Sequence, residues 1–160
     1  YMPLAVEVNL TNSPYVKTAG ARMAKYEVDP NAYNDGKSPD NDIVLFRYAD
    51  VLLMKAEAEV RNGENGDAEM NAVRSRSGMG YRPATLDNIL AERLMELMWE
   101  GWRRNDLIRF DRFHRSYDQR TAPATEVDRH TIVFPIPARV VDLNGKLVQN
   151  KGYEARPKSK

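Results

Sequence analysis

The stretch ERLMELMWEGWRRNDLIR, residues 92–109, constrains the fold of this chain more than any other part of the sequence. Apolar residues recur in it at helical spacing, and Thr85 is a suitable N-cap, so the pattern predicts one helix from Leu86 to Ile108. On a helical wheel its leucines, its methionines and both tryptophans, Trp99 and Trp102, fill more than half of the circumference. Because a surface helix has a narrower apolar stripe, the sequence predicts a helix buried on most sides, with both tryptophans in the core.

Six charged residues of this stretch form a group that we call the polar seam: Glu92, Arg93, Glu96, Glu100, Arg103 and Asp106. Acidic and basic residues three or four positions apart in a helix can form ion pairs. Glu92 and Glu96 would repel each other unless a cation lies near them, and an arginine of the seam or of another segment, such as Arg47, could supply it. The seam therefore predicts structural ion pairs at the polar edge of a buried helix.

An alternative is that the seam glutamates are catalytic, as in a carbohydrate-active hydrolase. Glycoside hydrolysis needs two carboxylates about 5 to 10 Å apart, which adjacent helical turns could provide. Neighbouring arginines, however, lower the pKa of a carboxyl group, whereas a general acid needs a raised pKa. A metal site would favour histidine beside the acids, and His114 and His130 lie elsewhere in the sequence. We therefore predict no catalytic residue, no metal site and no cofactor.

Composition excludes several other classes of function. The chain has 160 residues and a formal net charge of +1, so no strong field attracts nucleic acid or an anionic membrane. It has no cysteine, which excludes disulfides and thiolate chemistry. No apolar run approaches the roughly 20 residues of a membrane span. Because the chain starts at Tyr1, in the middle of a pattern, we expect it to be part of a longer protein.

Periodicity predicts a mainly α chain organised as one domain. Residues 1–42 are expected to form an extended arm and loop with a short β hairpin, residues 43–110 a helical core, and residues 111–160 a loop and an extended C-terminal segment. Within that last segment, IVFPIP is predicted to be extended, a short helix to follow Pro137, and Asn144-Gly145 to form a turn.

Two helices of the core are predicted to form an antiparallel hairpin similar to a tetratricopeptide repeat. The first is expected to start near Asp42 and to end at Gly63, and the second to be capped by Asp67 and to end at Gly78. The residues expected to face inward are Ala49, Leu52, Leu53, Ala56 and Val60 in the first helix and Ala68, Met70 and Val73 in the second. Such hairpins do not bury their apolar faces alone.

Five motifs, in this order, resemble the C-terminal half of the SusD/RagB family: RYADVLLMKAEAE, NAVRSRSG, ERLMELMWEGWRRNDLIRF, FPIP and LVQNKGY. The departures are small: Phe110 stands where the family often has tryptophan, Gly145 replaces a common proline after Asn144, and Lys151 replaces a proline. The resemblance implies a lipid-anchored protein of the outer membrane, exposed at the cell surface, whose N-terminal anchor this chain does not include. It further implies binding of oligosaccharide or polysaccharide without cleavage, and delivery to a SusC-like TonB-dependent transporter.

Sugar recognition needs aromatic faces for the apolar side of a pyranose and polar groups for its hydroxyls. In the family these groups come largely from loops, and three loops of this chain carry them: Tyr33 with Asn31 and Asn34, Tyr81 with Arg82, and Tyr117 with His114 and Gln119. We predict that glycan binds at such loops. The remaining alternative is a helical interaction scaffold that binds no ligand.

Overall fold

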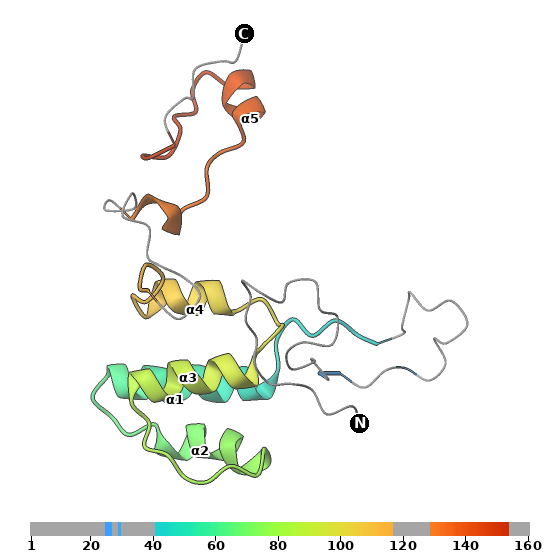
Figure 1. The fold of residues 1–160 in the computed structure, drawn as a ribbon, viewed down its shortest axis with the longest axis vertical. Helices are drawn as coiled ribbons and strands as arrows, with labels where there is room; N and C mark the ends of the chain where they lie inside the picture. Colours follow the sequence, from blue (N-terminus) through green and yellow to red (C-terminus); the bar gives the residue numbers. More distant parts are fainter. Residues whose placement is uncertain (1–24, 27–28, 30–40, 117–128, 154–160) are drawn as a thin grey trace, which may run out of the picture. The chain divides into compact units, whose positions relative to one another are not determined.

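The structure, a computed structural model, describes residues 25–26, 29, 41–116 and 129–153. The chain divides into two compact units, residues 1–44 and residues 45–160, and each is considered by itself. The predicted arm with its β hairpin lies almost wholly outside the described residues. The described part of the second unit is helical and contains no strand (Figure 1), which confirms the predicted mainly α class. None of its helices is long and apolar enough to span a membrane.

Three helices pack around one small core: α1 (Tyr48–Arg61), α2 (Asp67–Arg76) and α3 (Leu86–Glu96). Figure 1 shows α2 running back along α1, as the predicted hairpin requires, and α3 lying against α1. Thr85 caps α3 as expected, since its hydroxyl accepts a hydrogen bond from the Asn88 amide at 3.2 Å. The buried apolar residues that these helices share are Ala49, Leu53, Ala56, Met70, Val73, Ile89 and Leu90.

Three glycines shape the hairpin, and two of them end helices as the sequence predicts. Gly63 and Gly78 have φ values of +81° and +69°, so each ends its helix in the left-handed conformation that glycine adopts without strain. Gly66 has another role, because it lies so close to α1 that a Cβ atom there would be 2.5 Å from the Ala56 carbonyl oxygen. The connection between α1 and α2 therefore depends on a residue without a side chain.

Three details of the hairpin differ from the prediction. α1 begins at Tyr48 instead of near Asp42, because Arg47 is extended and its side chain is held by the ion pairs described below. Asp67 is the first residue of α2 and not its cap; its carboxylate accepts hydrogen bonds from the loop before α3 instead. Ala68 is exposed, whereas Met70 and Val73 are buried as predicted.

The long helix predicted from Leu86 to Ile108 is wrong, because the chain breaks between α3 and α4 (Arg103–Arg109). Trp99 and Gly101 have φ values of +70° and +82°, which no α-helix accommodates. The break lets α4 turn back along α3 (Figure 1).

The break also exposes several apolar side chains of residues 92–109 that were expected to lie in the core. Trp99 is 77% exposed, and Leu94, Met95 and Met98 are exposed with it. Trp102 is half-buried, with its ring 5.5 Å from that of Phe46. The prediction that both tryptophans lie in the core is therefore wrong, because it required one unbroken helix.

The C-terminal segment contains a short 3-10 helix, η2 (His130–Ile132), and α5 (Ala138–Leu143), which follows Pro137 as predicted. The predicted turn is confirmed by the hydrogen bond from the Leu147 amide to the Asn144 carbonyl at 2.9 Å. Side chains then join the two family-like motifs of this segment. The Gln149 amide group donates to the Ile136 carbonyl at 2.7 Å and accepts from the Ile136 amide at 2.8 Å.

Candidate functional site

The centre of the polar seam is a buried ion pair network between three helices. Arg93 of α3 donates to Asp50 of α1 at 2.8 Å, and its Nε lies 2.9 Å from the carboxylate of Asp106 in α4. Arg109 donates to the same oxygen of Asp106 at 2.7 Å. The side chains of Arg93, Asp50 and Asp106 are almost completely buried. Two guanidinium groups, of which Arg93 contacts both acids, thus offset two carboxylates that the fold removes from water.

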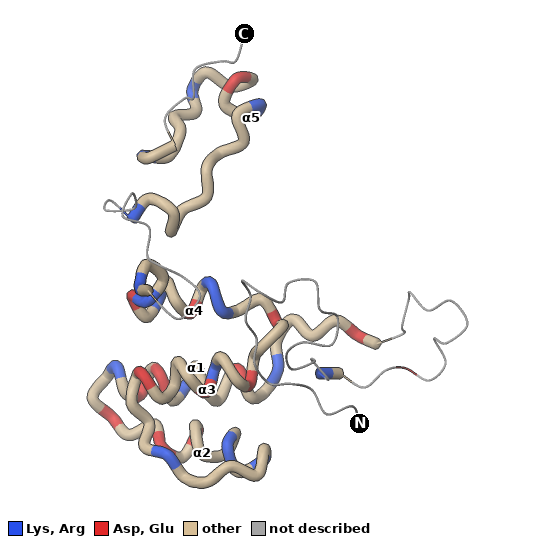
Figure 2. Tube along the Cα trace, viewed as in Figure 1, with Lys and Arg blue, Asp and Glu red and all other residues tan. Residues whose placement is uncertain are grey.

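The three seam glutamates contact arginines from other parts of the fold. Arg47, which the sequence suggested as a possible partner, contacts Glu96 through Nη1 and Glu100 through Nε at 2.9 Å. Burial disfavours the charged form of Arg47, but its hydrogen bonds to Glu100 and Glu96 outweigh that effect and raise its pKa. Glu92 is bound by Arg74 of α2, and both side chains are buried. Figure 2 shows the acidic and basic positions interspersed along these helices.

These contacts place each seam glutamate in an ion pair. Each of Glu92, Glu96 and Glu100 is bound to at least one guanidinium group, and their side chains are at most 9% exposed. A hydrolase needs one carboxyl group that keeps a proton beside an open cleft. Within the described ranges, moreover, no three acids or histidines are placed to hold a metal ion.

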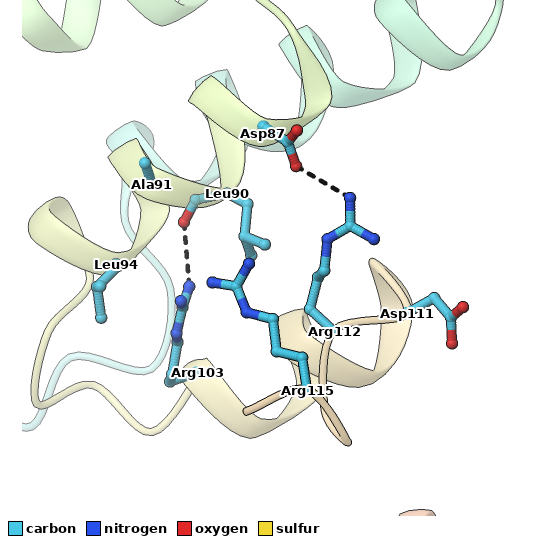
Figure 3. A pocket seen from close by; sticks show the side chains of 8 residues that line it. All are labelled: Asp87, Leu90, Ala91, Leu94, Arg103, Asp111, Arg112 and Arg115. Carbon is cyan, nitrogen blue, oxygen red and sulfur yellow. Dashed lines mark hydrogen bonds and ion pairs between the residues drawn. The ribbon is translucent and has the colours of Figure 1, made fainter. Parts of the chain in front are cut away.

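A pocket of about 500 Å³ lies on the other side of α3, where α4 and the turn that follows it face that helix (Figure 3). The α3 wall carries Asp87 and three apolar side chains, and the opposite wall carries three arginines and Asp111. The lining residues are Asp87, Leu90, Ala91, Leu94, Arg103, Asp111, Arg112 and Arg115.

Two ion pairs and one backbone contact fix the edges of this pocket. Arg112 donates to Asp87 at 3.2 Å across it, and Arg129 binds Asp111 from outside the lining. Arg103, a seam residue, donates from Nη1 to the Leu90 carbonyl at 3.1 Å. Arg103 and Arg112 are thereby held against α3.

The predicted glycan loop at Tyr81 is on the surface, between α2 and α3. The Tyr81 ring is 71% exposed, and its hydroxyl donates to Asp67 at 2.6 Å. This hydrogen bond, with a second one from the Ala84 amide, lowers the pKa of Asp67, and the same contact raises the pKa of Tyr81. Arg82 is half-buried, and both its backbone amide and its carbonyl bind the Asn71 side chain. The structure therefore presents an exposed, oriented aromatic ring at this loop.

The other predicted glycan residues are placed differently or not described. His114 is half-buried, with Nε2 2.9 Å from the Thr131 hydroxyl, and its ring packs edge to face on Phe113. The remaining predicted residues lie outside the described part of the chain: Asn31, Tyr33, Asn34, Tyr117 and Gln119.

Sequence reasoning missed most of the charged residues of the α3–α4 pocket. Arg103 was assigned to the seam, Asp87 fell within the predicted helix from Leu86 to Ile108, and Asp111, Arg112 and Arg115 were placed in the loop after the helical core. One signal was available: between Arg103 and Arg115 the sequence has five arginines and only two aspartates. That local excess of positive charge marks the pocket, but only the break before α4 brings it against α3.

Comparisons with known proteins give a consistent result. A family model described as the SusD family matches residues 7–153. The starch-binding protein SusD of Bacteroides thetaiotaomicron is 31% identical over 150 residues, which cover 86% of this chain and 27% of that protein. SusD-like protein P38 of Formosa agariphila is 33% identical over 130 residues, covering 71% of this chain and 25% of the relative.

Solved structures agree. Surface glycan-binding protein A from Bacteroides thetaiotaomicron matches with a TM-score of 0.58 and 31% identity, over 71% of this chain and 26% of that one. NanU of B. fragilis matches with a TM-score of 0.56 and 32% identity, over 72% of this chain and 28% of the other. The chain thus spans about a quarter of the length of these relatives. It belongs to the SusD family.

Proposed function

We propose that this chain is part of a cell-surface protein of the outer membrane that binds oligosaccharide or polysaccharide without cleaving it. The observation that carries the proposal is the match to a starch-binding protein over 86% of the chain, at 31% identity. A second match, to the solved structure of a surface glycan-binding protein, supports the same class of ligand because the two structures are similar.

Binding without cleavage is supported by the burial and ion pairs of the seam glutamates. The carboxylates that a hydrolase would use are buried and bound to arginines. The test is turnover on a panel of glycans by the chain and by Glu96→Gln. We expect neither protein to release product; hydrolysis by the parent that Glu96→Gln loses would establish the rival enzyme and overturn the proposal.

Among the described candidates, Tyr81 is the ring best placed to stack on a sugar, because it is exposed and oriented by Asp67. Calorimetry with maltooligosaccharides and other neutral oligosaccharides tests this role. We expect Tyr81→Ala to weaken binding at least tenfold and Tyr81→Phe, which keeps the ring, to retain most of the affinity. Tyr48→Ala is the matched control, since Tyr48 is an equally exposed tyrosine on α1. Absence of binding to every glycan would favour the ligand-free scaffold.

Delivery of the bound sugar to a SusC-like TonB-dependent transporter completes the proposal. Family membership supports this step, which is tested separately from glycan binding. Affinity purification of the tagged full-length protein from outer membranes should recover a TonB-dependent transporter in stoichiometric amount. Recovery of the protein alone, under conditions that preserve other outer-membrane complexes, would contradict this step and leave the binding proposal intact.

A further inference from the structure

A second pocket, which we call the α1–α4 pocket, lies between α1 and α4 and has a volume of about 320 Å³. That volume is within the range of about 300–1,000 Å³ typical of small-molecule sites. Its lining combines one large aromatic ring with apolar side chains and hydrogen-bonding groups. The lining residues are Met54, Glu57, Ala58, Arg61, Arg93, Trp102, Asn105, Asp106 and Arg109. The pocket is separate from the Tyr81 loop, because Tyr81 does not line it.

Trp102 supplies the aromatic surface of this pocket. It is half-buried, and its ring packs on that of Phe46 with 5.5 Å between the ring centroids, which orients the indole. Met54 and Ala58 of α1 extend the apolar surface, and Met54 is partly exposed. An oriented and partly exposed indole ring is a surface on which the apolar face of a pyranose can stack.

Hydrogen-bonding groups lie beside that ring. Asn105 is an exposed residue of α4, and its side-chain amide can both donate and accept. Glu57 holds two arginines at the pocket, because it accepts from Nε of Arg61 at 2.8 Å and from Nη1 of Arg109. Each guanidinium group has more N–H donors than these contacts use, so both can also donate to sugar hydroxyls.

The charged groups at this pocket are paired with one another, which narrows the ligand. Three guanidinium groups and three carboxylates form one connected set of ion pairs: Arg61, Arg93, Arg109, Glu57, Asp106 and Asp50. Because positive and negative groups are equal in number, the set offers hydrogen bonds without a net charge that would attract an ionised ligand. An aromatic ring with an amide and paired charged groups suits a neutral sugar, whose hydroxyls both donate and accept.

We propose that the α1–α4 pocket binds a neutral pyranose unit of an oligosaccharide, which stacks on Trp102 and whose hydroxyls bind Asn105 and the two arginines held by Glu57. This inference rests on the proposed function, because it adds a second site to a glycan-binding protein. Two sites on one protein can engage a polysaccharide at two points, which raises the overall affinity when the glycan spans both.

Tryptophan fluorescence of the whole chain tests the inference at the proposed contact. The chain has two tryptophans, so Trp99→Phe leaves Trp102 as the only source of tryptophan emission. Trp99 is exposed and does not line the pocket, so its replacement should leave the site intact. We titrate this variant with maltoheptaose, cellohexaose and xylohexaose. At least one of them should give a saturable shift in emission, because a stacked sugar replaces water at the indole ring.

Variants of Asn105, made in the Trp99→Phe background, connect that shift to the pocket. Asn105→Ala should weaken binding by about threefold to tenfold, because it removes one hydrogen bond to the sugar. Asn105→Gln, which retains an amide group, should bind more tightly than Asn105→Ala. Asn144→Ala removes an exposed asparagine that does not line the pocket, and should bind as the parent. Alanine is favourable in a helix, and thermal unfolding checks that Asn105→Ala folds.

The failures of this inference and of the proposed function are distinguishable. Binding of an oligosaccharide in calorimetry without a change in Trp102 emission would overturn the inference while the proposed function stands. A shift whose affinity Asn105→Ala leaves unchanged would overturn it as well, and so would a shift that Tyr81→Ala abolishes, because the Tyr81 loop would then be the site. If no glycan bound in calorimetry or changed the emission, the result would count against both.

Discussion

Arg93 on α3 donates a hydrogen bond of 2.8 Å to Asp50 on α1, and both side chains are almost completely excluded from solvent. The same guanidinium group has Nε 2.9 Å from Asp106 on α4. The second carboxylate oxygen of Asp50 accepts no hydrogen bond from the described residues. Three helices are therefore joined through one cation, on which Asp50 depends, whereas Asp106 is also bound by Arg109.

Replacing that cation should be severely destabilising. Arg93→Met leaves buried Asp50 without its hydrogen-bond donor and Asp106 with Arg109 alone, and breaking a buried pair in this way costs about 3–5 kcal/mol. Urea unfolding followed by circular dichroism measures the loss. Arg76→Met is the matched control, because Arg76 is exposed where it pairs with Glu96, and exposed pairs contribute at most about 1 kcal/mol. Similar midpoints for the two variants would contradict the buried network.

Glu96→Ala should also lower the stability of the chain, but by less. Glu96 accepts from Arg47 and from exposed Arg76, and Arg47 keeps Glu100 as a partner in the variant. The expected loss is about 1–3 kcal/mol, the cost of leaving a largely buried charged donor without one acceptor. Differential scanning calorimetry should show a lower melting temperature than that of Glu64→Ala, which removes an exposed glutamate beyond α1. An unchanged melting temperature would refute the structural role assigned to the seam.

The close approach of Gly66 to the backbone of Ala56 predicts a steric effect that helix propensity alone does not. Gly66→Ala places a methyl group 2.5 Å from the backbone oxygen of Ala56, and backbone in a helix cannot move aside as a flexible side chain can. We expect a loss of about 1–3 kcal/mol, as for other overpacked sites. Gly80→Ala meets no atom within 4 Å and has no positive φ, so it should be neutral or slightly stabilising in the same urea titration.

Local signals made the hairpin predictable, and tertiary contacts made the rest unpredictable. Gly63 and Gly78 end their helices through a backbone preference that is visible in the sequence. The break after α3 instead places Trp99 at φ +70°, a conformation that no local rule assigns to tryptophan. Gly101 was the one available warning, since an isolated glycine lowers the expectation of a continuous helix.

The candidate site, too, was predictable only where local sequence signals determine it. The spacing of the seam residues showed that their charges needed partners, but the partners of Glu92 and Arg93 come from other helices: Arg74, 18 positions before Glu92, and Asp50, 43 positions before Arg93. Helical periodicity relates residues only a few positions apart, so it cannot identify partners at these sequence separations. The α3–α4 pocket was missed for the same reason, because Arg115 lines it only after α4 has turned back along α3.

The hydrogen bond between Tyr81 and Asp67 predicts a pH-dependent contact. It lowers the pKa of Asp67, so its contribution to stability is present above the usual carboxyl pKa of 3.8 and is lost as pH falls through the lowered value. The raised pKa of Tyr81 means that the contribution persists up to about pH 10 and is lost above it. An NMR titration of the Asp67 carboxyl carbon should show its pKa rising toward the usual value in Tyr81→Phe. Tyr48→Phe, which removes an exposed hydroxyl from α1, should leave it unchanged.

The side chain of Gln149 predicts a local effect in the C-terminal segment. It pairs with both the amide and the carbonyl of Ile136, as a strand would, so it protects the Ile136 amide hydrogen from exchange. Gln149→Ala should accelerate exchange at Ile136 by tenfold or more, measured by NMR. Asn144→Ala removes a comparable bond, from the Lys146 amide to the Asn144 side chain, and should leave Ile136 unaffected. Gln149→Glu separates the two halves of the contact, because a carboxylate still accepts from the amide but donates nothing to the carbonyl. If Gln149→Ala left exchange at Ile136 unchanged, Gln149 would not be what joins the FPIP and QNKGY motifs.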